Sequence, residues 1–355
     1  MLRVRASFEY VRRDRRNVSL FNSNTGPELA AAVTNAGGLG VIGGVGYTPN
    51  FLKMQIEELK SNLKDKNAPF GVDLLLPKVG GGARKTNKDY TNGQLPELID
   101  IIIESGAKLF VSAVGVPPRW AVDKLHKAGI PCMNMIGAPK HVKYALAAGC
   151  DIICAQGGEG GGHTGAVPTS VLIPKVVDLC RGKISPLTGR QVCVVAAGGI
   201  FDSRGLALAL CCGADAVWVG TRFVVSKEAG APPAHQKAVM ECGYDDTIRT
   251  VIFTGRPMRV RKTEYIMDWE NNRQDEIKSL TGRGKLPIEH DINRIKSNEL
   301  ELPEGGMMGM RPWLMGKCAG ALSDVKSAKE IIDEMVSGAI KILRGANRSI
   351  TYSRL

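Results

Sequence analysis

A glycine-rich stretch in the middle of the chain encloses one histidine. Between Ala155 and Gly165, six of the eleven residues are glycine, and His163 lies among them. Glycine allows a backbone to lie flat against a planar ligand, and an imidazole beside it can act as a general base or as a hydrogen-bond donor to an anionic substrate. The neighbouring Glu159 is expected to be solvated. The stretch therefore predicts a ligand-binding loop with His163 as its catalytic group.

The remaining histidines and the cysteines lack such surroundings. We expect structural or surface positions for His126, His141, His235 and His290. Nine cysteines lie mostly in apolar stretches and form no C-x-x-C pair. This usage favours buried thiols in a reducing compartment over disulfides or zinc, so no metal site is expected.

Two shorter glycine motifs each follow an apolar run. Gly198-Gly199 comes after Val192–Ala197, and Gly220-Thr221 comes after Ala216–Val219. Glycine lets backbone N–H groups approach phosphate oxygens, and threonine adds a hydroxyl, so the pair favours a cofactor with one terminal phosphate over ordinary turns. FMN is the commonest such cofactor in α/β barrels. Gly38-Leu-Gly40-Val-Ile-Gly43 instead follows a helical segment, and so indicates a helix end and a tight turn.

These motifs lie in a repeated strand–helix pattern. From residue 27 onward, β-branched runs alternate with amphipathic stretches, which is typical of parallel strands joined by helices. The expected strands are Gly40–Ile42, Phe70–Leu76, Leu109–Val114, Pro131–Ile136, Asp151–Ala155, Val192–Ala197 and Ala216–Val219. A closed barrel needs an eighth, and Val18–Phe21 is the apolar run available, although it is atypically short. The predicted fold class is α/β, a TIM (β/α)8 barrel with a helical insertion near the C-terminus.

Composition divides the chain into four expected segments. Residues 1–17 form a basic N-terminal segment, and residues 18–255 form the FMN-binding barrel. Residues 256–310 are charged and weakly apolar, which indicates a helical cap or lid. Apolar periodicity returns in Ala328–Leu343, so residues 311–355 are expected to hold a closing helix and a tail.

The overall composition excludes several classes of protein. Hydrophobic residues make up 44% and charged residues 23%, which is ordinary globular usage rather than that of a disordered chain. The apolar runs are too short to cross a bilayer. The formal charge of +12 owes much to arginines near the N-terminus, and few aromatic residues are available to stack on bases. A small-molecule substrate is therefore expected, with no nucleic-acid or membrane partner, in a monomer or homodimer.

Eight short motifs occur in a fixed order between about residues 26 and 345. They are Pro27-Glu-Leu-Ala-Ala-Ala-Val, Asn35-Ala-Gly-Gly-Leu-Gly, Gly71-Val-Asp, the Gln156–Gly165 loop, Ala197-Gly-Gly-Ile, Gly220-Thr-Arg-Phe, Asp268-Trp-Glu and Arg311-Pro-Trp-Leu-Met-Gly-Lys. The set resembles the nitronate monooxygenases, formerly called 2-nitropropane dioxygenases. The resemblance implies a TIM barrel that binds FMN non-covalently and oxidises alkyl nitronates with O₂ to a carbonyl compound and nitrite. Whether neutral nitroalkanes are also used stays open.

The resemblance also implies roles for individual residues. His163 corresponds to the catalytic histidine. Residues that correspond to those lining the flavin ring or holding its phosphate are Gln156, Gly161, Gly162, Gly198, Gly199, Gly220 and Thr221, with backbone contacts from Trp218 and Val219. Asp73 stands where the family often has asparagine, a position that the resemblance places near the flavin. A carboxylate there would resist the build-up of negative charge when the flavin is reduced.

The first strand departs from the family pattern, which leaves an impaired relative open, and the loops leave a second alternative open. The family usually has P-I-x-x-A-P-M, whereas this chain has Asn17-Val-Ser-Leu-Phe-Asn, with Phe21 near the place of the methionine. One alternative is a catalytically impaired flavin-binding relative. The other is an FMN- and NAD(P)H-dependent enoyl-thioester reductase, which resembles the family in the same loops. An IMP dehydrogenase-type barrel is disfavoured, since no cysteine nucleophile follows the strand at Asp151–Ala155.

The last three residues suggest a cellular address. Ser353-Arg354-Leu355 is similar to the S-K-L peroxisomal signal, with arginine in place of lysine. A cytoplasmic location is the main alternative. A mitochondrial address for the arginine-rich N-terminus is disfavoured by Glu9 and Asp14, since transit peptides are poor in acidic residues.

Overall fold

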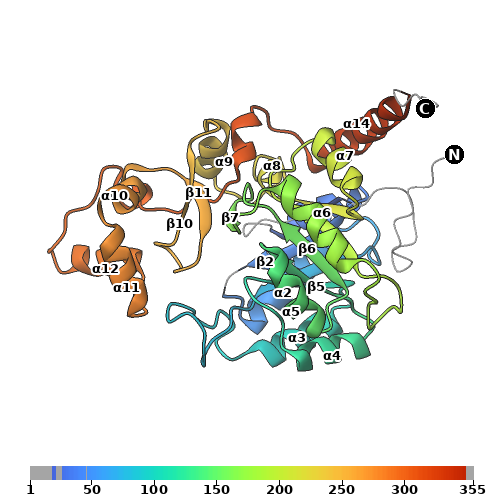
Figure 1. Cartoon of the computed structure of the whole chain (residues 1–355), viewed down its shortest axis with the longest axis horizontal. Coiled ribbons are helices and arrows are strands. Elements are labelled where there is room, and N and C mark those ends of the chain that lie inside the picture. Colours follow the sequence, from blue (N-terminus) through green and yellow to red (C-terminus); the bar gives the residue numbers. More distant parts are fainter. Residues whose placement is uncertain (1–17, 21–25, 45, 349–355) are drawn as a thin grey trace, which may run out of the picture.

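The computed structural model describes residues 18–20, 26–44 and 46–348 (Figure 1). Eight parallel strands close into a barrel in the order β1-β2-β3-β4-β5-β6-β8-β9. They are β1 (Val18–Leu20), β2 (Leu39–Gly44), β3 (Phe70–Leu75), β4 (Leu109–Ala113), β5 (Cys132–Ile136), β6 (Ile152–Gln156), β8 (Cys193–Ala197) and β9 (Ala216–Val219). The predicted TIM-barrel fold class is confirmed. Residues 1–17, Phe21 and the Ser353–Leu355 tripeptide lie outside the described residues.

The atypical first strand closes the barrel. Ser19 in β1 lies opposite Leu39 of β2 on one side and opposite Trp218 of β9 on the other. The polar Asn17 and Asn22 on either side of the strand therefore do not prevent it from pairing on both edges.

The barrel strands bury both of their faces, as parallel strands covered by helices must. Along β8, Val195 and Ala197 point into the barrel interior, while Val194 and Ala196 pack outward against the helices. The surrounding helices are α1 (Pro27–Asn35), α2 (Pro49–Asn62), α3 (Leu95–Glu104), α4 (Arg119–Lys127), α5 (Val142–Ala147), α6 (Thr169–Cys180), α7 (Ser203–Cys211) and the short α8 (Thr221–Val224). This two-layer packing fixes the carboxyl ends of the strands, where the candidate residues lie.

A second lobe, orange in Figure 1, follows the barrel in the chain. Its elements are α9 (Pro233–Met240), β10 (Thr247–Thr250), β11 (Met258–Arg261), α10 (Glu264–Asn272), α11 (Gln274–Gly282), α12 (Pro287–Lys296) and the short α13 (Gly306–Gly309). The sequence suggested only helices here. The structure adds a sheet in which β10 and β11 pair with each other and β11 pairs with β7 (Gly162–His163) from the barrel. Alternating arginines in β11 concealed this strand, since arginine is not typical of a buried strand.

A buried carboxylate ties the cap helices together. Asp291 on α12 is completely buried and accepts hydrogen bonds from Trp269 Nε1 at 3.1 Å and Tyr265 Oη at 3.2 Å. Arg273 donates two further bonds to its two oxygens at 2.8 and 2.9 Å. A buried charge paired in this way would cost several kcal/mol to leave without its arginine, about 3–5 kcal/mol in typical cases.

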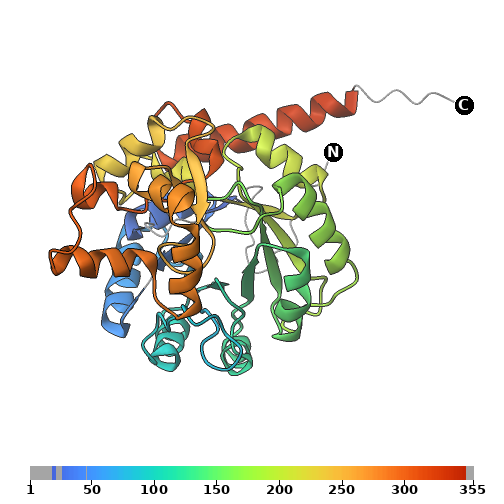
Figure 2. The same ribbon diagram turned by 60° about the vertical axis from the view of Figure 1, so that its left-hand side comes forward.

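The last helix returns to the barrel. The apolar face of α14 (Ala328–Arg348) includes Ile331, Ile332 and Met335, which are buried in the same core as the outer faces of β8 and β9. Its C-terminal half extends away from the other elements (Figure 2). Among the described residues, no helix is both long and apolar enough to cross a membrane.

Candidate active site

His163 is positioned by the cap as well as by the barrel. It lies in β7, opposite Met258 of β11, at the end of the glycine-rich loop that leaves β6. Gln156, the last residue of β6, donates from Nε2 to the backbone carbonyls of His163 at 3.1 Å and Gly161 at 3.3 Å. The loop is thus folded back on its own strand, and the cap strand fixes its end.

The imidazole makes one hydrogen bond to the segment that links β10 to β11. His163 Nε2 lies 3.0 Å from Thr254 Oγ1, and the Thr254 hydroxyl donates to the Arg256 carbonyl at 3.3 Å. Because the Thr254 hydroxyl gives its hydrogen to that carbonyl, it can only accept a hydrogen bond from the imidazole. His163 must then carry its proton on Nε2. Nδ1 then keeps its lone pair, and the described residues offer it no hydrogen-bond donor. The ring can therefore accept a proton at Nδ1.

The protein keeps this ring neutral. Burial, and after it the positive charge of Arg256, together lower the pKa of His163 to about 4. An imidazole with such a pKa is unprotonated throughout the neutral range. It is therefore available as a base, although a weak one, and it adds no positive charge to the site.

Arg256 brings a positive charge to the same place. Its Nε donates to Asn87 Oδ1 at 3.0 Å and its Nη1 to the Val114 carbonyl at 2.6 Å, so it joins the cap to two barrel loops. Val114 has a φ of 67°, which is strained for a β-branched residue. Arg84 adds a bond from Nη1 to the Gly255 carbonyl at 3.0 Å. The two guanidinium groups lie close enough for Arg84 to lower the pKa of Arg256, after burial as the main cause.

The side chain of Arg259, on β11, is hydrogen-bonded to the backbone of the glycine-rich loop. Its Nε and Nη2 donate to the Gly158 carbonyl at 3.0 and 2.8 Å, and its Nη1 donates to Thr247 Oγ1 at 3.1 Å. The side chain is buried. This fork fixes a loop whose glycines would otherwise be free to move.

The first of the two expected phosphate loops is shaped by contact between backbones. Gly198 and Gly199 have φ values of 91° and 75°, and a Cβ on Gly198 would lie 2.7 Å from the Gly157 carbonyl oxygen. Glycine is therefore needed at position 198 for the approach of two loops. The Gly199 N–H has no hydrogen-bond partner among the described residues. Glu159, expected to be solvated, is instead half-buried, and its carboxylate accepts bonds from Thr169 N and Oγ1 at 2.9 and 2.8 Å.

The second expected phosphate loop meets the segment after the cap. Thr221 Oγ1 accepts a hydrogen bond from Gly316 N at 2.9 Å, and a Cβ on Gly161 would lie 2.6 Å from the Met315 carbonyl carbon. Gly220 caps the short helix α8. The side chain of Trp218 packs in the barrel interior, and the side chain of Val219 packs outward against the helices.

Asp73 lies inside the barrel, on strand β3. It is opposite Gly43 of β2 and Val111 of β4, is buried, and its Oδ1 has no hydrogen-bond partner. Burial raises its pKa well above the usual range for aspartate. Tyr47 and Cys154 lie near enough for an Asp73 carboxylate to raise their pKa values too, in both cases after burial, and Tyr47 reaches about 12.

These features fit the flavin that the sequence suggested. Gly162 has a φ of 67°, and a Cβ there would meet no atom within 4 Å, so open space lies in front of the loop. Among the described residues, Asp73 Oδ1 is a buried polar atom without a hydrogen-bond partner, and the Gly199 N–H is a free donor suited to an anion. A planar ring beside Gly162 and Asp73, with its phosphate at Gly199 and Thr221, would satisfy them.

Proteins of known family match almost the whole chain. A family model described as nitronate monooxygenase matches residues 22–338. The chain belongs to the nitronate monooxygenase family. A probable nitronate monooxygenase of Bacillus subtilis is 29% identical over 90% of this chain and 93% of its own. The resemblance drawn from the motifs is thereby confirmed, and the family relatives indicate an oxidoreductase.

Other similar proteins carry different names. The "(3aS,4S,5R,7aS)-5-hydroxy-7a-methyl-1-oxo-octahydro-1H-indene-4-carboxyl-CoA dehydrogenase" of Mycobacterium tuberculosis is 32% identical over 91% of this chain and 92% of its own length. The solved structure of FabK from Thermotoga maritima has a TM-score of 0.73 and 27% identity, with 94% of this chain and 95% of that chain covered. The chain is therefore similar over nearly its whole length to proteins that carry different names.

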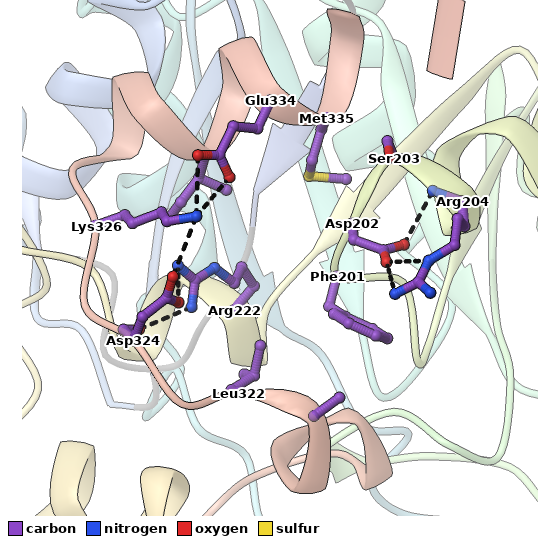
Figure 3. Close-up of a pocket in the computed structure, with 12 residues that line it drawn as sticks. Phe201, Asp202, Ser203, Arg204, Arg222, Leu322, Asp324, Lys326, Glu334 and Met335 are labelled. Carbon is purple, nitrogen blue, oxygen red and sulfur yellow. Dashed lines mark hydrogen bonds and ion pairs between the residues drawn. The ribbon is translucent and has the colours of Figure 1, made fainter. Parts of the chain in front are cut away.

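A cavity of about 240 Å³ lies outside this site, between the start of α7 and the start of α14 (Figure 3). Three basic side chains line it, but each is already paired. Arg222 binds Asp324, Lys326 binds Asp324 and Glu334, and Arg204 binds Asp202. Because the charges cancel, the cavity offers no net attraction to an anionic ligand.

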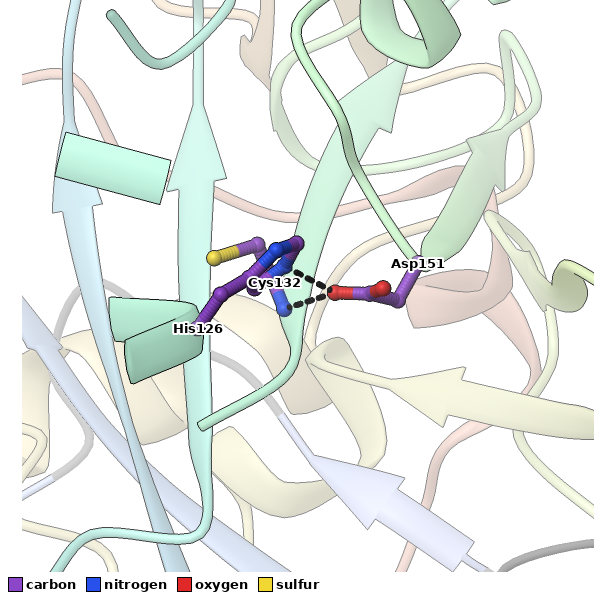
Figure 4. Close-up of side chains that lie close together, drawn as sticks. All are labelled: His126, Cys132 and Asp151. Atoms are coloured by element: carbon purple, nitrogen blue, oxygen red, sulfur yellow. Dashed lines mark hydrogen bonds and ion pairs between the residues drawn. The ribbon is translucent and has the colours of Figure 1, made fainter. Parts of the chain in front are cut away.

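Three potential metal ligands also gather at the amino end of β5 and β6 (Figure 4). His126 Nε2 lies 2.8 Å from Asp151 Oδ2, which also accepts from Cys132 N at 2.8 Å, and Ser185 Oγ donates to Asp151 Oδ1 at 2.6 Å. The carboxylate is thus occupied by protein donors. The cluster joins neighbouring strands, which agrees with the structural position expected for His126.

Sequence reasoning missed the residues that the cap and the loop after β2 contribute. Thr254, Arg256, Arg259 and Tyr47 belong to no glycine motif and carry no distinctive spacing. A usable signal was the alternation of Met258 and Val260 with Arg259 and Arg261, which predicts a β-strand that pairs with another strand in a sheet.

Proposed function

We propose that the protein binds one FMN and oxidises alkyl nitronates with O₂ to a carbonyl compound and nitrite. The observation that carries this proposal is the combination of a neutral His163 with the cationic Arg256 at the end of a glycine-lined loop. A nitronate is a small anion, and such a site attracts an anion while keeping an acceptor for the carbon-bound proton of the corresponding neutral nitroalkane. Membership of the nitronate monooxygenase family supports the same chemistry.

Each group of residues has a separate task in this proposal. Gly199 N–H and Thr221 would hold the phosphate, while Gly161, Gly162 and Asp73 would face the ring. When bound, FMN would take up electrons from the nitronate and pass them to O₂. Arg256 would bind the nitronate oxygens, and His163 Nδ1 would accept the proton that must leave when the substrate is a neutral nitroalkane.

Redox chemistry on an acyl thioester is the second candidate. It is favoured by the carboxyl-CoA dehydrogenase of M. tuberculosis, which is 32% identical over nearly the full length. A thioester would present its carbonyl to the same neutral imidazole and would depend less on Arg256, because it carries no charge at the reacting group.

One experiment separates these functions. Purified protein loaded with FMN is mixed aerobically with the nitronates of small nitroalkanes, and oxygen uptake and nitrite are followed. Nitrite formed together with oxygen uptake supports nitronate oxidation. Flavin bleached anaerobically by NAD(P)H alone, without nitrite from any nitronate, would replace the proposal with the thioester function, and a yellow protein inert in both assays would indicate an impaired relative.

A further inference from the structure

We propose that Asp73 is an uncharged carboxylic acid in the resting protein and that it donates its proton in a hydrogen bond to the flavin ring. The proposal rests on the proposed function only in requiring that FMN binds. It would make Asp73 a residue that sets the electron affinity of the cofactor, and it reverses the expectation that a carboxylate at this position would oppose flavin reduction.

The first step is that the described residues offer no donor or cation to stabilise a negative charge on Asp73. Asp73 is 4% exposed, its Oδ1 has no hydrogen bond, and its register neighbours are Gly43 and Val111. The titratable groups that face it, Tyr47 after β2 and Cys154 on β6, are both uncharged acids. Within the described residues, no cation or backbone donor compensates a carboxylate at this place.

An ion in such surroundings would be costly. Burying a carboxylate without donors or a counter-ion costs far more than burying the neutral acid, so the group keeps its proton instead. Burial accordingly raises the pKa of Asp73 well above its usual range. Asp151 in the same barrel shows the contrasting case, since four protein donors surround its two oxygens.

The second step concerns the acceptor that the acid requires. A protonated carboxyl has an O–H donor, and a buried donor left unpaired costs about 1–3 kcal/mol in other proteins. The described protein groups supply no acceptor to Oδ1, so the ligand must supply it. Nitrogen and carbonyl oxygen atoms at the edge of a flavin ring are acceptors, and they become stronger as the ring gains negative charge.

The test compares two substitutions whose effects have opposite signs under the two charge states. Asp73→Asn keeps a neutral donor of the same shape, and Asp73→Val keeps the shape without a donor. If Asp73 is the proposed donor, the flavin reduction equilibrium at pH 7 changes less than about threefold in Asp73→Asn. In Asp73→Val it moves toward the oxidised form by about tenfold or more, because a hydrogen bond to a charging group is lost. If Asp73 is ionised, both variants move toward the reduced form, and the proposal is overturned.

A second measurement reads the proton directly. The infrared spectrum of the FMN-loaded protein at pH 7 should contain the carbonyl stretch of a protonated carboxyl that is missing from Asp73→Asn and retained in the control Asp89→Asn. Asp89 is a suitable control, because hydrogen bonds from Thr91 and Gly93 lower its pKa and keep it ionised. A difference spectrum without that band overturns the proposal.

Failure of this proposal can be told from failure of the proposed function. A protein that binds FMN and shows the protonated carboxyl but forms no nitrite contradicts only nitronate oxidation. A protein that cannot be loaded with FMN contradicts both. Nitrite formation together with an ionised Asp73 contradicts only the inference made here.

Discussion

The floor of the candidate site and its wall on the cap are held together by different kinds of contact. On the floor, the loops after β6 and β8 touch through backbone atoms, as where the Cβ that Gly198 lacks would overlap the Gly157 carbonyl. On the wall, Thr254, Arg256 and Arg259 reach the barrel through side-chain hydrogen bonds. Where two backbones touch, as at Gly198, the floor has no space for an added atom, whereas the wall can lose one hydrogen bond at a time. Substitutions should therefore abolish the site on the floor and weaken it by degrees on the wall.

The largest effect is expected at Gly198. Gly198→Ala adds a Cβ 2.7 Å from the Gly157 carbonyl at a φ of 91°, so the two loops must separate and the FMN should be lost. The matched control is Gly182→Ala, because Gly182 has a φ of 71° but no atom within 4 Å of the added Cβ. The control should lose only about 1–2 kcal/mol of stability from its backbone conformation and keep its flavin.

Flavin absorbance per protein and the free energy of unfolding measure this difference. Equal flavin content in the two variants would show that the floor is adaptable and would remove the contrast with the wall.

The next effect is expected where floor and wall meet, at His163. His163→Asn should lower the turnover of neutral nitroalkanes by about 10²–10⁴-fold, because a carbon-bound proton must then leave without a base. Nitronates are already deprotonated, so their turnover should fall much less. Because the pKa of His163 is about 4, the wild-type rate with neutral nitroalkanes should not change through this group between about pH 5.5 and 9. It should fall only as the imidazole is protonated at lower pH.

Steady-state rates for a nitroalkane and its nitronate, measured with flavin content as the control, test this assignment. Similar losses on both substrates would mean that His163 binds the anion instead of removing a proton.

The sequence could reveal the floor far better than the wall. The residues of the floor are glycines whose missing side chains are themselves the signal, so Gly161, Gly162, Gly198 and Gly199 could be named without coordinates. Even there, the sequence could not show that position 198 must be glycine because the Gly157 carbonyl lies against it. Thr254 and Arg256 lie about ninety residues after His163, and only the pairing of β11 with β7 brings them together. The barrel strands could be predicted from local patterns, because a short β-branched run is a property of each strand alone and its alternation with helical stretches predicts parallel neighbours. The cap sheet did not, because its two longest strands have four residues each and arginines among them.

A smaller effect is expected from Arg256 on the wall. Arg256→Met should raise the pKa of His163, because the guanidinium lowers it, and should raise KM for nitronates by about tenfold or more through loss of a charged hydrogen-bond donor. Arg84→Met is the control, since Arg84 is also a cation bonded to the cap backbone, through the Gly255 carbonyl. It should change KM less and leave kcat unaltered.

The pH at which activity falls on the acid side, together with KM and kcat, distinguishes the two arginines. An unchanged KM in Arg256→Met would show that the wall holds the cap in place without binding the substrate.

The smallest effect is expected at Thr254, whose hydroxyl joins the His163 ring to the backbone of Arg256. Thr254→Val keeps the shape of the side chain but removes the oxygen that accepts the His163 Nε2 proton at 3.0 Å. The ring would lose the bond that fixes its tautomer and orientation, and a neutral hydrogen bond is worth about 0.5–1.5 kcal/mol, so nitroalkane turnover should fall by about two- to tenfold. Thr250→Val is the matched control, because Thr250 lies on the adjoining strand and its hydroxyl accepts only from Ile252 N at 3.2 Å. The pH dependence of kcat, the flavin content and the stability are measured for both variants. If only Thr254→Val loses activity, while it binds flavin and is as stable as Thr250→Val, the effect lies in the orientation of the His163 ring and not in folding. Equal losses in the two variants would show that the wall acts only by keeping the cap sheet intact, and the graded behaviour expected of it would then be wrong.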